Sequence, residues 1–142
     1  MLVENILQTK GVVVHTLPET GTLADAVAAL NRHNIGAVVI TGPGDNIVGI
    51  LSERDIVRRL GTDPAGALSL PIADCMVRGV VTSEPLTTID EVMERMTTLR
   101  IRHMPVVNGG TMVGIVSIGD VVKFKIEAAE QEATALREYI AS

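Results

Sequence analysis

The chain is poor in aromatic residues, in cysteine and in long hydrophobic runs. Its 142 residues include no tryptophan, one phenylalanine and one tyrosine, so stacking platforms for single-stranded nucleic acids are missing. Cys75 is the only cysteine, which excludes an internal disulfide and favours a reducing compartment. No apolar run approaches the roughly 20 residues that span a bilayer, and the N-terminal segment lacks the order of a signal peptide. We therefore expect a cytoplasmic protein that does not enter a membrane.

Basic residues are also outnumbered. Twelve lysines and arginines stand against 17 aspartates and glutamates, which gives a formal net charge of −5. Binding to nucleic acid or to an acidic membrane needs a basic surface, so neither partner is expected. Apolar residues make up 46% of the chain, which predicts a folded domain with an aliphatic core. His15, His33 and His103 share no metal-ligand spacing, so we expect no metal site.

The sequence repeats itself at a constant spacing, which shortens by one position after a glycine-rich turn. The longest match aligns Gly49–Val57 with Gly114–Val122. The upstream matches include Ile6 with Ile72, Val14 with Val80, Thr16 with Thr82, Thr22 with Thr88, and Ile35 with Ile101. A duplication of this kind is the first feature to establish because it decides the fold. We divide the chain into a first repeat (1–65), a second repeat (66–128) and a C-terminal helical extension (129–142).

Each repeat predicts the element order strand, helix, strand, strand, helix. From Leu23 and from Ile89, apolar residues recur at i, i+3, i+4 and i+7, which marks one face of a helix. Glycine-containing turns between short apolar runs indicate a hairpin in each repeat. The expected strands are Val12–His15, Ala37–Ile40, Val48–Leu51, Val80–Thr82, Met104–Val107 and Met112–Val116. The closing helices are expected to begin at Glu53 and Ile118, with Gly61–Pro71 as the linker between repeats. The predicted fold is α/β (α+β), with two pseudo-twofold-related β-α-β-β-α repeats packed sheet to sheet and a C-terminal helix.

A hydroxyl residue followed three positions later by an acid begins each predicted helix. The pairs are Thr22 with Asp25, Ser52 with Asp55, Thr88 with Glu91, and Ser117 with Asp120. This spacing is the capping box, so a purely structural role is one interpretation. The other is ligand binding, because a hydroxyl and free N–H groups at a helix N-terminus suit a phosphate, and a carboxylate one turn further in suits ribose hydroxyls. The Ser52 and Ser117 pairs follow a strand directly, which favours ligand contact there.

Two kinds of motif in the chain resemble those of CBS domains. The segments Gly49–Val57 and Gly114–Val122 are similar to the closing motif of that family, and Ile101–Val107 is similar to its second-strand motif. The resemblance covers about residues 6–60 and 72–127, as a stand-alone tandem pair called a Bateman module. It implies a regulatory module that binds an adenosyl ligand: AMP, ADP, ATP, NAD or S-adenosylmethionine.

The resemblance also implies roles for individual residues. It assigns ribose to Asp55 and Asp120, phosphate or ribose to Ser52 and Ser117, and adenine to Thr16 and Thr82. It assigns phosphate to Arg102 and His103, which begin a motif that continues through Met104 and Pro105. The first repeat departs from the pattern, since Gly36 and Ala37 stand where the second has Arg102 and His103. Arg54, whose counterpart is Gly119, is the candidate for the missing charge, so we expect two unequal sites.

The last helix carries a second apolar pattern. Steps of four and three positions connect the members of an a/d seam, namely Val122, Ile126, Ala129, Ala133, Leu136 and Ile140. Such a seam pairs with a second copy of the helix or folds back on its own chain. Because families of this type often dimerise, we expect a homodimer.

Three hypotheses for function follow. The first is a sensor of energy or redox state that binds an adenine nucleotide and signals to a regulated protein in trans. The second is a structural or protein-interaction module whose pockets are unused and whose Ser/Asp pairs only cap helices. The third is an enzyme, which the absence of any acid–base or nucleophile constellation disfavours. We therefore expect no catalytic residue and no catalytic cofactor.

Overall fold

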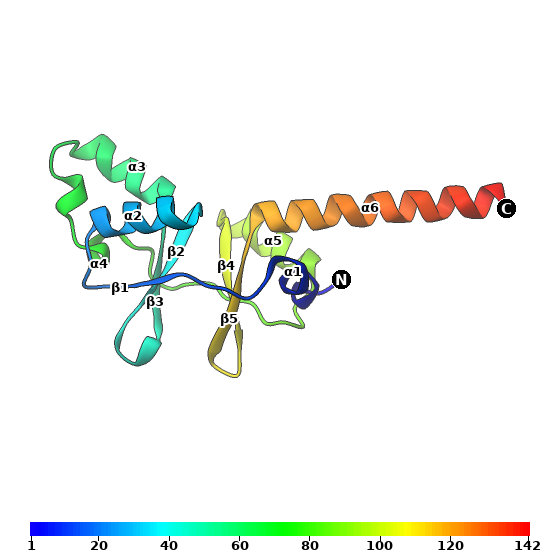
Figure 1. Ribbon diagram of the computed structural model, residues 1–142, viewed down its shortest axis with the longest axis horizontal. Coiled ribbons are helices and arrows are strands. Elements are labelled where there is room, and N and C mark those ends of the chain that lie inside the picture. The colour runs from blue at the N-terminus through cyan, green and yellow to red at the C-terminus, as the bar shows by residue number, and fades with distance from the viewer. The chain divides into compact units, whose positions relative to one another are not determined.

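The computed structural model describes residues 1–142, which form a mixed α+β fold of two compact units (Figure 1). Residues 13–81 form the first, which we call the Asp55 unit. Residues 1–12 together with residues 82–142 form the second, which we call the Asp120 unit. The N-terminal segment therefore belongs to the unit that contains the second repeat. None of the helices combines the length and the hydrophobicity that a membrane span requires.

The Asp55 unit is built on a three-stranded sheet in the order β1-β2-β3. Strand β1 (Thr16–Pro18) pairs parallel to β2 (Ala37–Thr41), and β2 pairs antiparallel to β3 (Ile47–Ser52). The central strand is buried from Ala37 to Ile40, as its unbroken apolar run predicts. A short 3₁₀ turn (η1, Pro43–Asp45) joins β2 to β3. This sheet ends at Ser52, where the closing helix begins.

Helices complete the core of the Asp55 unit. Helix α2 (Leu23–His33) buries Leu23, Ala26 and Leu30, which lie on one face at helical spacing. Helix α3 (Glu53–Thr62) follows β3 without a loop. The predicted linker is mostly exposed, but η2 (Ala67–Ser69) anchors it through Ala67, which is fully buried, and it leads into α4 (Ile72–Cys75).

The Asp120 unit repeats this plan on a two-stranded sheet. Strand β4 (His103–Asn108) pairs antiparallel to β5 (Thr111–Ser117) through the tight turn at Gly109 and Gly110. Both glycines have positive φ, 60° and 82°, which a two-residue hairpin of this type requires. Helix α5 (Ile89–Leu99) precedes the hairpin, and α6 (Ile118–Ala141) follows it. A single parallel bridge between Ser83 and Val106 replaces the third strand.

Two of the predicted strands are wrong in position. Val12–His15 is not a strand, and β1 begins only at Thr16; Val80–Thr82 is not a strand either. Val12 and Val13 are 65% and 75% exposed, so the run of valines connects the units instead of filling a core. The divisions between the units fall in these same two segments. Apolar composition alone therefore placed the first strand too early and predicted a strand in the second repeat, where only the Ser83–Val106 bridge forms.

A short helix packs against each hairpin. In each unit this helix comes from the chain segment that precedes the strands and helices of the other unit. Helix α1 (Val3–Lys10) belongs to the Asp120 unit, and α4 belongs to the Asp55 unit. The Val3 N–H donates to the carbonyl of Thr87, and the Ile72 N–H donates to that of Gly21. Leu7 covers Gly114, as Met76 covers Gly49. These contacts make Val3 the counterpart of Ile72, so the sequence pairing of Ile6 with Ile72 is wrong by about one helical turn.

Helix α6 is one continuous helix of 24 residues, so the extension predicted at 129–142 has no break before it. Its first turn packs on the unit through Val121, which is fully buried. Figure 1 shows the helix continuing beyond α5 and α1 of its own unit. Ile126, Leu136 and Ile140 are 54%, 58% and 73% exposed. The seam therefore does not fold back on its own unit.

Candidate functional site

Ser52 and Asp55 form a reciprocal pair where β3 passes into α3. Ser52 is extended, with φ −111°, and its hydroxyl oxygen accepts from the Asp55 N–H at 3.4 Å. Asp55 Oδ2 accepts from the Ser52 N–H at 2.9 Å and from the Ser52 hydroxyl at 3.0 Å. Both side chains are half-buried. The pair caps the helix, and the carboxylate also lies at the positive end of its dipole.

Ser117 and Asp120 repeat this geometry where β5 passes into α6. The Asp120 N–H donates to the Ser117 hydroxyl oxygen at 3.1 Å, and Asp120 Oδ2 accepts from the Ser117 N–H at 2.8 Å. One further donor reaches this carboxylate. Lys10, at the end of α1, places its ammonium 2.6 Å from Asp120 Oδ2 and 2.9 Å from the carbonyl oxygen of Ile115. Asp120 is thus held by a residue that the sequence analysis did not single out.

The charge state of Asp120 follows from these contacts. Burial raises the pKa of the carboxyl group, but hydrogen bonds from Lys10 and from the Ser117 N–H lower it, as does the Lys10 charge. The combined effect holds the pKa below its ordinary value of 3.8. Asp120 is therefore a carboxylate at neutral pH, able only to accept hydrogen bonds.

The second-strand motif lies beside the Ser117 pair. His103 is directly opposite Ser117 in the β4–β5 register, and the Arg102 carbonyl accepts from the Ile118 N–H at 2.8 Å. The Asp55 unit has the same backbone frame with smaller side chains. There Ala37 is opposite Ser52, and the Gly36 carbonyl accepts from the Glu53 N–H at 3.0 Å. The frame is shared by the units, and the charge of this motif is present in only one.

The other predicted site residues occupy different surroundings. Arg54 is exposed on the first turn of α3, and its counterpart Gly119 adds no side chain to α6. Met104 is fully buried and Pro105 is buried, so these two belong to the core of the Asp120 unit. Arg102 is exposed, and His103 is half-buried.

Thr16 and Thr82, predicted to meet adenine, differ in their contacts. Thr16 is exposed at the first position of β1, opposite Val39. The Thr82 carbonyl accepts from the Arg95 guanidinium at 2.9 Å. The next residue, Ser83, is only 3% exposed, and its hydroxyl has no hydrogen-bond partner within the protein. A buried hydroxyl in this state is costly, which makes Ser83 a candidate site residue that no sequence motif indicated.

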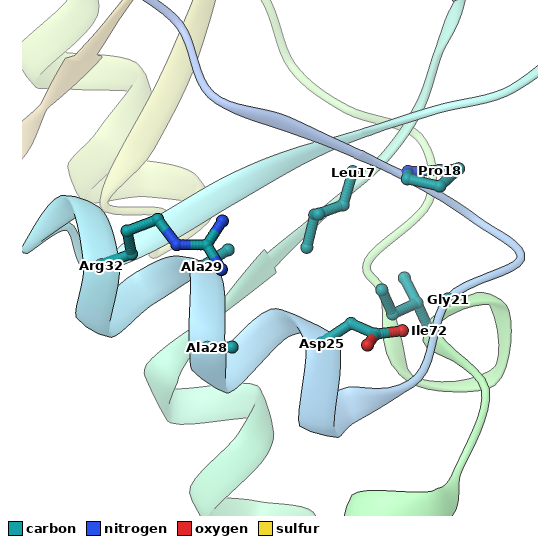
Figure 2. Close-up of a pocket in the computed structure, with 8 residues that line it drawn as sticks. All are labelled: Leu17, Pro18, Gly21, Asp25, Ala28, Ala29, Arg32 and Ile72. Atoms are coloured by element: carbon teal, nitrogen blue, oxygen red, sulfur yellow. The ribbon is translucent and has the colours of Figure 1, made fainter.

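A separate hollow of about 290 Å³ lies in the Asp55 unit between β1 and α2 (Figure 2). Its lining is Leu17, Pro18, Gly21, Asp25, Ala28, Ala29, Arg32 and Ile72. The Asp25 carboxylate there accepts from the Thr22 N–H at 2.9 Å, so it serves as a helix cap. None of the predicted site residues lines this hollow. Asp25 and Arg32 are its only charged residues, and the rest of its wall is apolar. This lining does not indicate a nucleotide site.

Nothing in the structure assembles a metal centre or a reactive thiol. No group of three or more His, Cys, Asp or Glu residues is placed to hold a metal ion. Cys75 is free and 8% exposed. Burial is the largest influence on its thiol and raises the pKa, so the reactive thiolate is disfavoured. Cys75 packs as a small apolar residue in the core of the Asp55 unit.

Known proteins share both the sequence pattern and the fold. Residues 3–62 and 72–127 each match the CBS domain. The chain is 37% identical over 123 residues to "CBS domain-containing protein CBSX3, mitochondrial" of Arabidopsis thaliana. That match covers 84% of this chain and 60% of the plant protein, so the chain spans less than two thirds of that relative.

Solved structures of CBS proteins superpose on most of the chain. The CBS-domain containing protein ATU1752 from Agrobacterium tumefaciens has a TM-score of 0.83 and 38% identity, covering 86% of this chain and 91% of its own. The CBS domain pair of MJ0100, in complex with 5′-methylthioadenosine and S-adenosylmethionine, has a TM-score of 0.80 and 26% identity, covering 90% and 98%. The CBS domain protein PAE2072 from Pyrobaculum aerophilum, complexed with AMP, has a TM-score of 0.74 and 28% identity, covering 84% and 89%. The chain therefore belongs to the CBS domain family and carries the domain twice.

Proposed function

We propose that the protein is a regulatory module that binds an adenosyl ligand at the Ser52–Asp55 and Ser117–Asp120 junctions and signals the bound state to a partner. One observation carries the proposal. In both units a carboxylate and a hydroxyl are held with the same hydrogen bonds at a strand-to-helix junction. A helix N-terminus of this kind offers free N–H groups to a phosphate, and a carboxylate accepts ribose hydroxyls.

Each site residue has a role in this proposal. Asp55 and Asp120 accept ribose hydroxyls, while Ser52 and Ser117 contact ribose or phosphate. Arg102 supplies positive charge to the phosphate at the second site, and His103 contacts the same phosphate. Arg54 supplies it at the first site, because a planar guanidinium at a helix N-terminus suits phosphate oxygens. Thr16 and Thr82 line the adenine side.

Relatives with bound ligands support the ligand class. MJ0100 was solved with 5′-methylthioadenosine and S-adenosylmethionine, and PAE2072 with AMP. All three compounds contain adenosine, and AMP adds a phosphate. For this chain we propose an adenosyl ligand drawn from AMP, ADP, ATP, NAD and S-adenosylmethionine. A sensor needs different affinity for the ligand in two states rather than chemistry, so no catalytic residue is required.

Thermal stability with a ligand panel tests the proposal. A ligand present at about 100 times its dissociation constant should raise the free energy of unfolding by about 2.7 kcal/mol. The panel is AMP, ADP, ATP, NAD and S-adenosylmethionine, with GTP as a control that keeps the phosphates and changes the base. The nucleotides should be recovered unchanged after long incubation, and steady turnover would favour an enzyme instead. If no adenosyl compound shifts the melting temperature at millimolar concentration, the proposal is wrong.

The second candidate function is a structural module whose Ser/Asp pairs only cap helices. The observation that favours it is that the hydrogen bonds of Asp55 are made within its own capping box. Asp55→Asn and Asp120→Asn separate the two candidates, because the amide oxygen still accepts the capping hydrogen bond. Loss of the ligand response at nearly unchanged stability supports ribose binding. Retained binding with lower stability supports capping.

We also propose that the module is a homodimer paired through α6. The exposed seam residues Ile126, Leu136 and Ile140 recur at the spacing of a coiled coil. Leu136→Lys should convert a dimer to a monomer in sedimentation equilibrium, whereas Thr134→Lys, which adds the same charge beside the seam, should not. A wild-type monomer at high protein concentration would contradict this assembly.

The remaining proposals concern the cellular location of the protein and the partner that receives its signal. We propose a cytoplasmic location, which a single free cysteine fits; the Arabidopsis relative carries "mitochondrial" in its name. We propose that the output passes to a separate regulated protein.

A further inference from the structure

Lys10 creates the main chemical difference between the two proposed sites. Its ammonium lies 2.6 Å from Asp120 Oδ2, and the Lys10 and Asp120 side chains are 36% and 25% exposed. Asp55 forms no ion pair; its Oδ2 accepts only from Ser52. In the Asp55 unit the matching helix, α4, already ends at Cys75, and the chain continues extended so that Val77 bridges to Ile50, the counterpart of Ile115. The Asp55 unit therefore has no helical lysine in the place of Lys10, and its carboxylate has no ion pair.

The Lys10 ammonium contacts the same carboxylate oxygen of Asp120 that a bound ribose would use. Two ribose hydroxyls need both oxygens of the carboxylate, and Oδ2 of Asp120 already accepts from the Ser117 N–H and from Lys10. A bound ribose must displace the ammonium or share the oxygen with it. The Lys10 side chain is 36% exposed, so a displaced ammonium can turn to water or, more favourably, to an anion that the ligand brings.

We propose that Lys10 makes the Asp120 site selective for adenosyl ligands that carry a phosphate, a proposal that rests on the function proposed above. The lysine stem is flexible and its ammonium has three donors, so it can turn from the carboxylate to a phosphate nearby. The N-terminus of α6 attracts the same anion. Adenosine offers the ammonium no anion. S-adenosylmethionine has a carboxylate, but only beyond a sulfonium cation that repels the ammonium. The Asp55 site, which has no such lysine, discriminates less among these ligands.

Single-site variants allow the proposal to be tested. Asp55→Asn removes the first site and leaves the Asp120 site to report alone. In this background, calorimetry measures the affinities for AMP, adenosine and S-adenosylmethionine. We expect AMP to bind at least about tenfold more tightly than adenosine, since a charge-assisted hydrogen bond is worth about that factor or more.

Lys10→Met then removes the charge and keeps much of the aliphatic stem. We expect the ratio of the AMP affinity to the adenosine affinity to fall by about tenfold or more, with adenosine binding unchanged or tighter. Lys10→Arg should keep most of the preference. The matched control is Lys125→Met, which removes another lysine ion pair of the same unit, the one with Asp90 at 2.8 Å, and should leave the ratio unchanged.

The outcomes separate this proposal from the proposed function. If the Lys10→Met variant binds AMP and adenosine with the wild-type ratio, adenosyl binding stands and the role of Lys10 is wrong. If Lys125→Met lowers the ratio equally, the effect is general electrostatics and the assignment to Lys10 is also wrong. If no adenosyl compound binds to either the Asp55→Asn or the Asp120→Asn protein, the proposed function fails and this inference fails with it.

Discussion

The Asp55 and Asp120 units share a backbone frame and differ in what is added to it. In both, a strand runs directly into a helix, a capping box holds the junction, and a short helix covers a glycine of the hairpin. The carboxylates diverge: Asp55 accepts only from its own Ser52, whereas Asp120 accepts from its own Ser117 and also from Lys10, 110 residues away in the chain. The comparison teaches that duplication kept the parts that form the fold. The chemistry changed at side chains that reach the frame from outside the repeat.

The largest effect should come from the short helices. Leu7 and Met76 are 7% and 8% exposed, and each covers a hairpin glycine of its unit. Leu7→Ala and Met76→Ala should each lower the free energy of unfolding by about 2–5 kcal/mol, because each leaves a cavity. Val12→Ala, at a 65% exposed position, is the control and should change it by less than about 0.5 kcal/mol. Urea denaturation measures all three.

Hydrogen exchange can show which unit each helix supports. Leu7→Ala should speed exchange in β5 and α6, and Met76→Ala should speed it in β3 and α3, because local stability follows local packing. If Leu7→Ala loosens β2 and β3 instead, the assignment of α1 to the Asp120 unit is wrong.

The two capping serines should differ by a smaller amount. Removing an N-cap hydroxyl costs about 1 kcal/mol. Ser52→Ala also removes the hydroxyl donor to Asp55 Oδ2 and leaves only the Ser52 N–H, whereas after Ser117→Ala the Asp120 carboxylate keeps both the Ser117 N–H and Lys10. Ser52→Ala should therefore cost more than Ser117→Ala, measured as free energy of unfolding, with exposed Ser69→Ala as the control. Equal costs would mean that Lys10 does not compensate at the second junction.

A still smaller effect is expected on the free energy of unfolding at acidic pH, where Asp120 becomes protonated. The pKa of Asp120 is lowered in the folded protein, so its charged form adds stability above about pH 3.8, and this is lost as pH falls through the lower folded pKa. The pair is partly exposed, which limits the contribution to about 0.2–1 kcal/mol. Asp120→Asn should remove this part of the pH dependence of unfolding, and Glu130→Gln, an exposed acid on α6, should keep it. An unchanged acid limb in Asp120→Asn would show that Lys10 does not stabilise the carboxylate.

The sequence predicts what depends on neighbours along the chain. The four N-cap residues, the hairpins and the start of both closing helices follow from local spacing, and all lie where expected. Three of the four pairs form the full capping box, while Thr88 only accepts from the Glu91 N–H. The valines at 12–14 misled the strand prediction, because apolar composition does not tell a buried strand from an exposed connection.

The sequence does not predict what depends on distant segments. Helix α1 packs with the segment around Thr87, far along the chain, and its alignment with α4 differs from the spacing of the repeat. Lys10 could not be found for the same reason, since no local pattern connects it to Asp120. Ser83 shows the same limit, because its burial depends on β4. The ligand-binding roles of all the predicted site residues, including Thr16, Thr82 and Arg102, remain predictions.

The smallest expected effect belongs to the Asp55 unit alone. His15 and His33 stack with ring centroids 3.5 Å apart and planes 10° apart, and the repeat alignment gives Val81 and Leu99 as their counterparts. Desolvation lowers the pKa of His33 below its ordinary value of 6.5, with smaller contributions from His15 and Arg32. Because the folded pKa is the lower one, stability falls as pH drops below about 6.5 and stops falling below the folded pKa.

The substitution His15→Val gives this position the residue of the second repeat. It removes the contribution of His15 to the lowered pKa of His33 and leaves the larger contribution of desolvation. The His33 midpoint in an NMR titration should therefore rise only part of the way to 6.5. Arg32→Gln is the control for the third and smallest influence and should raise it less. A midpoint that does not move would show that the stacked rings are not electrostatically coupled. The stacking would then be a packing difference between the units, unlike the Lys10 difference, which is one of charge.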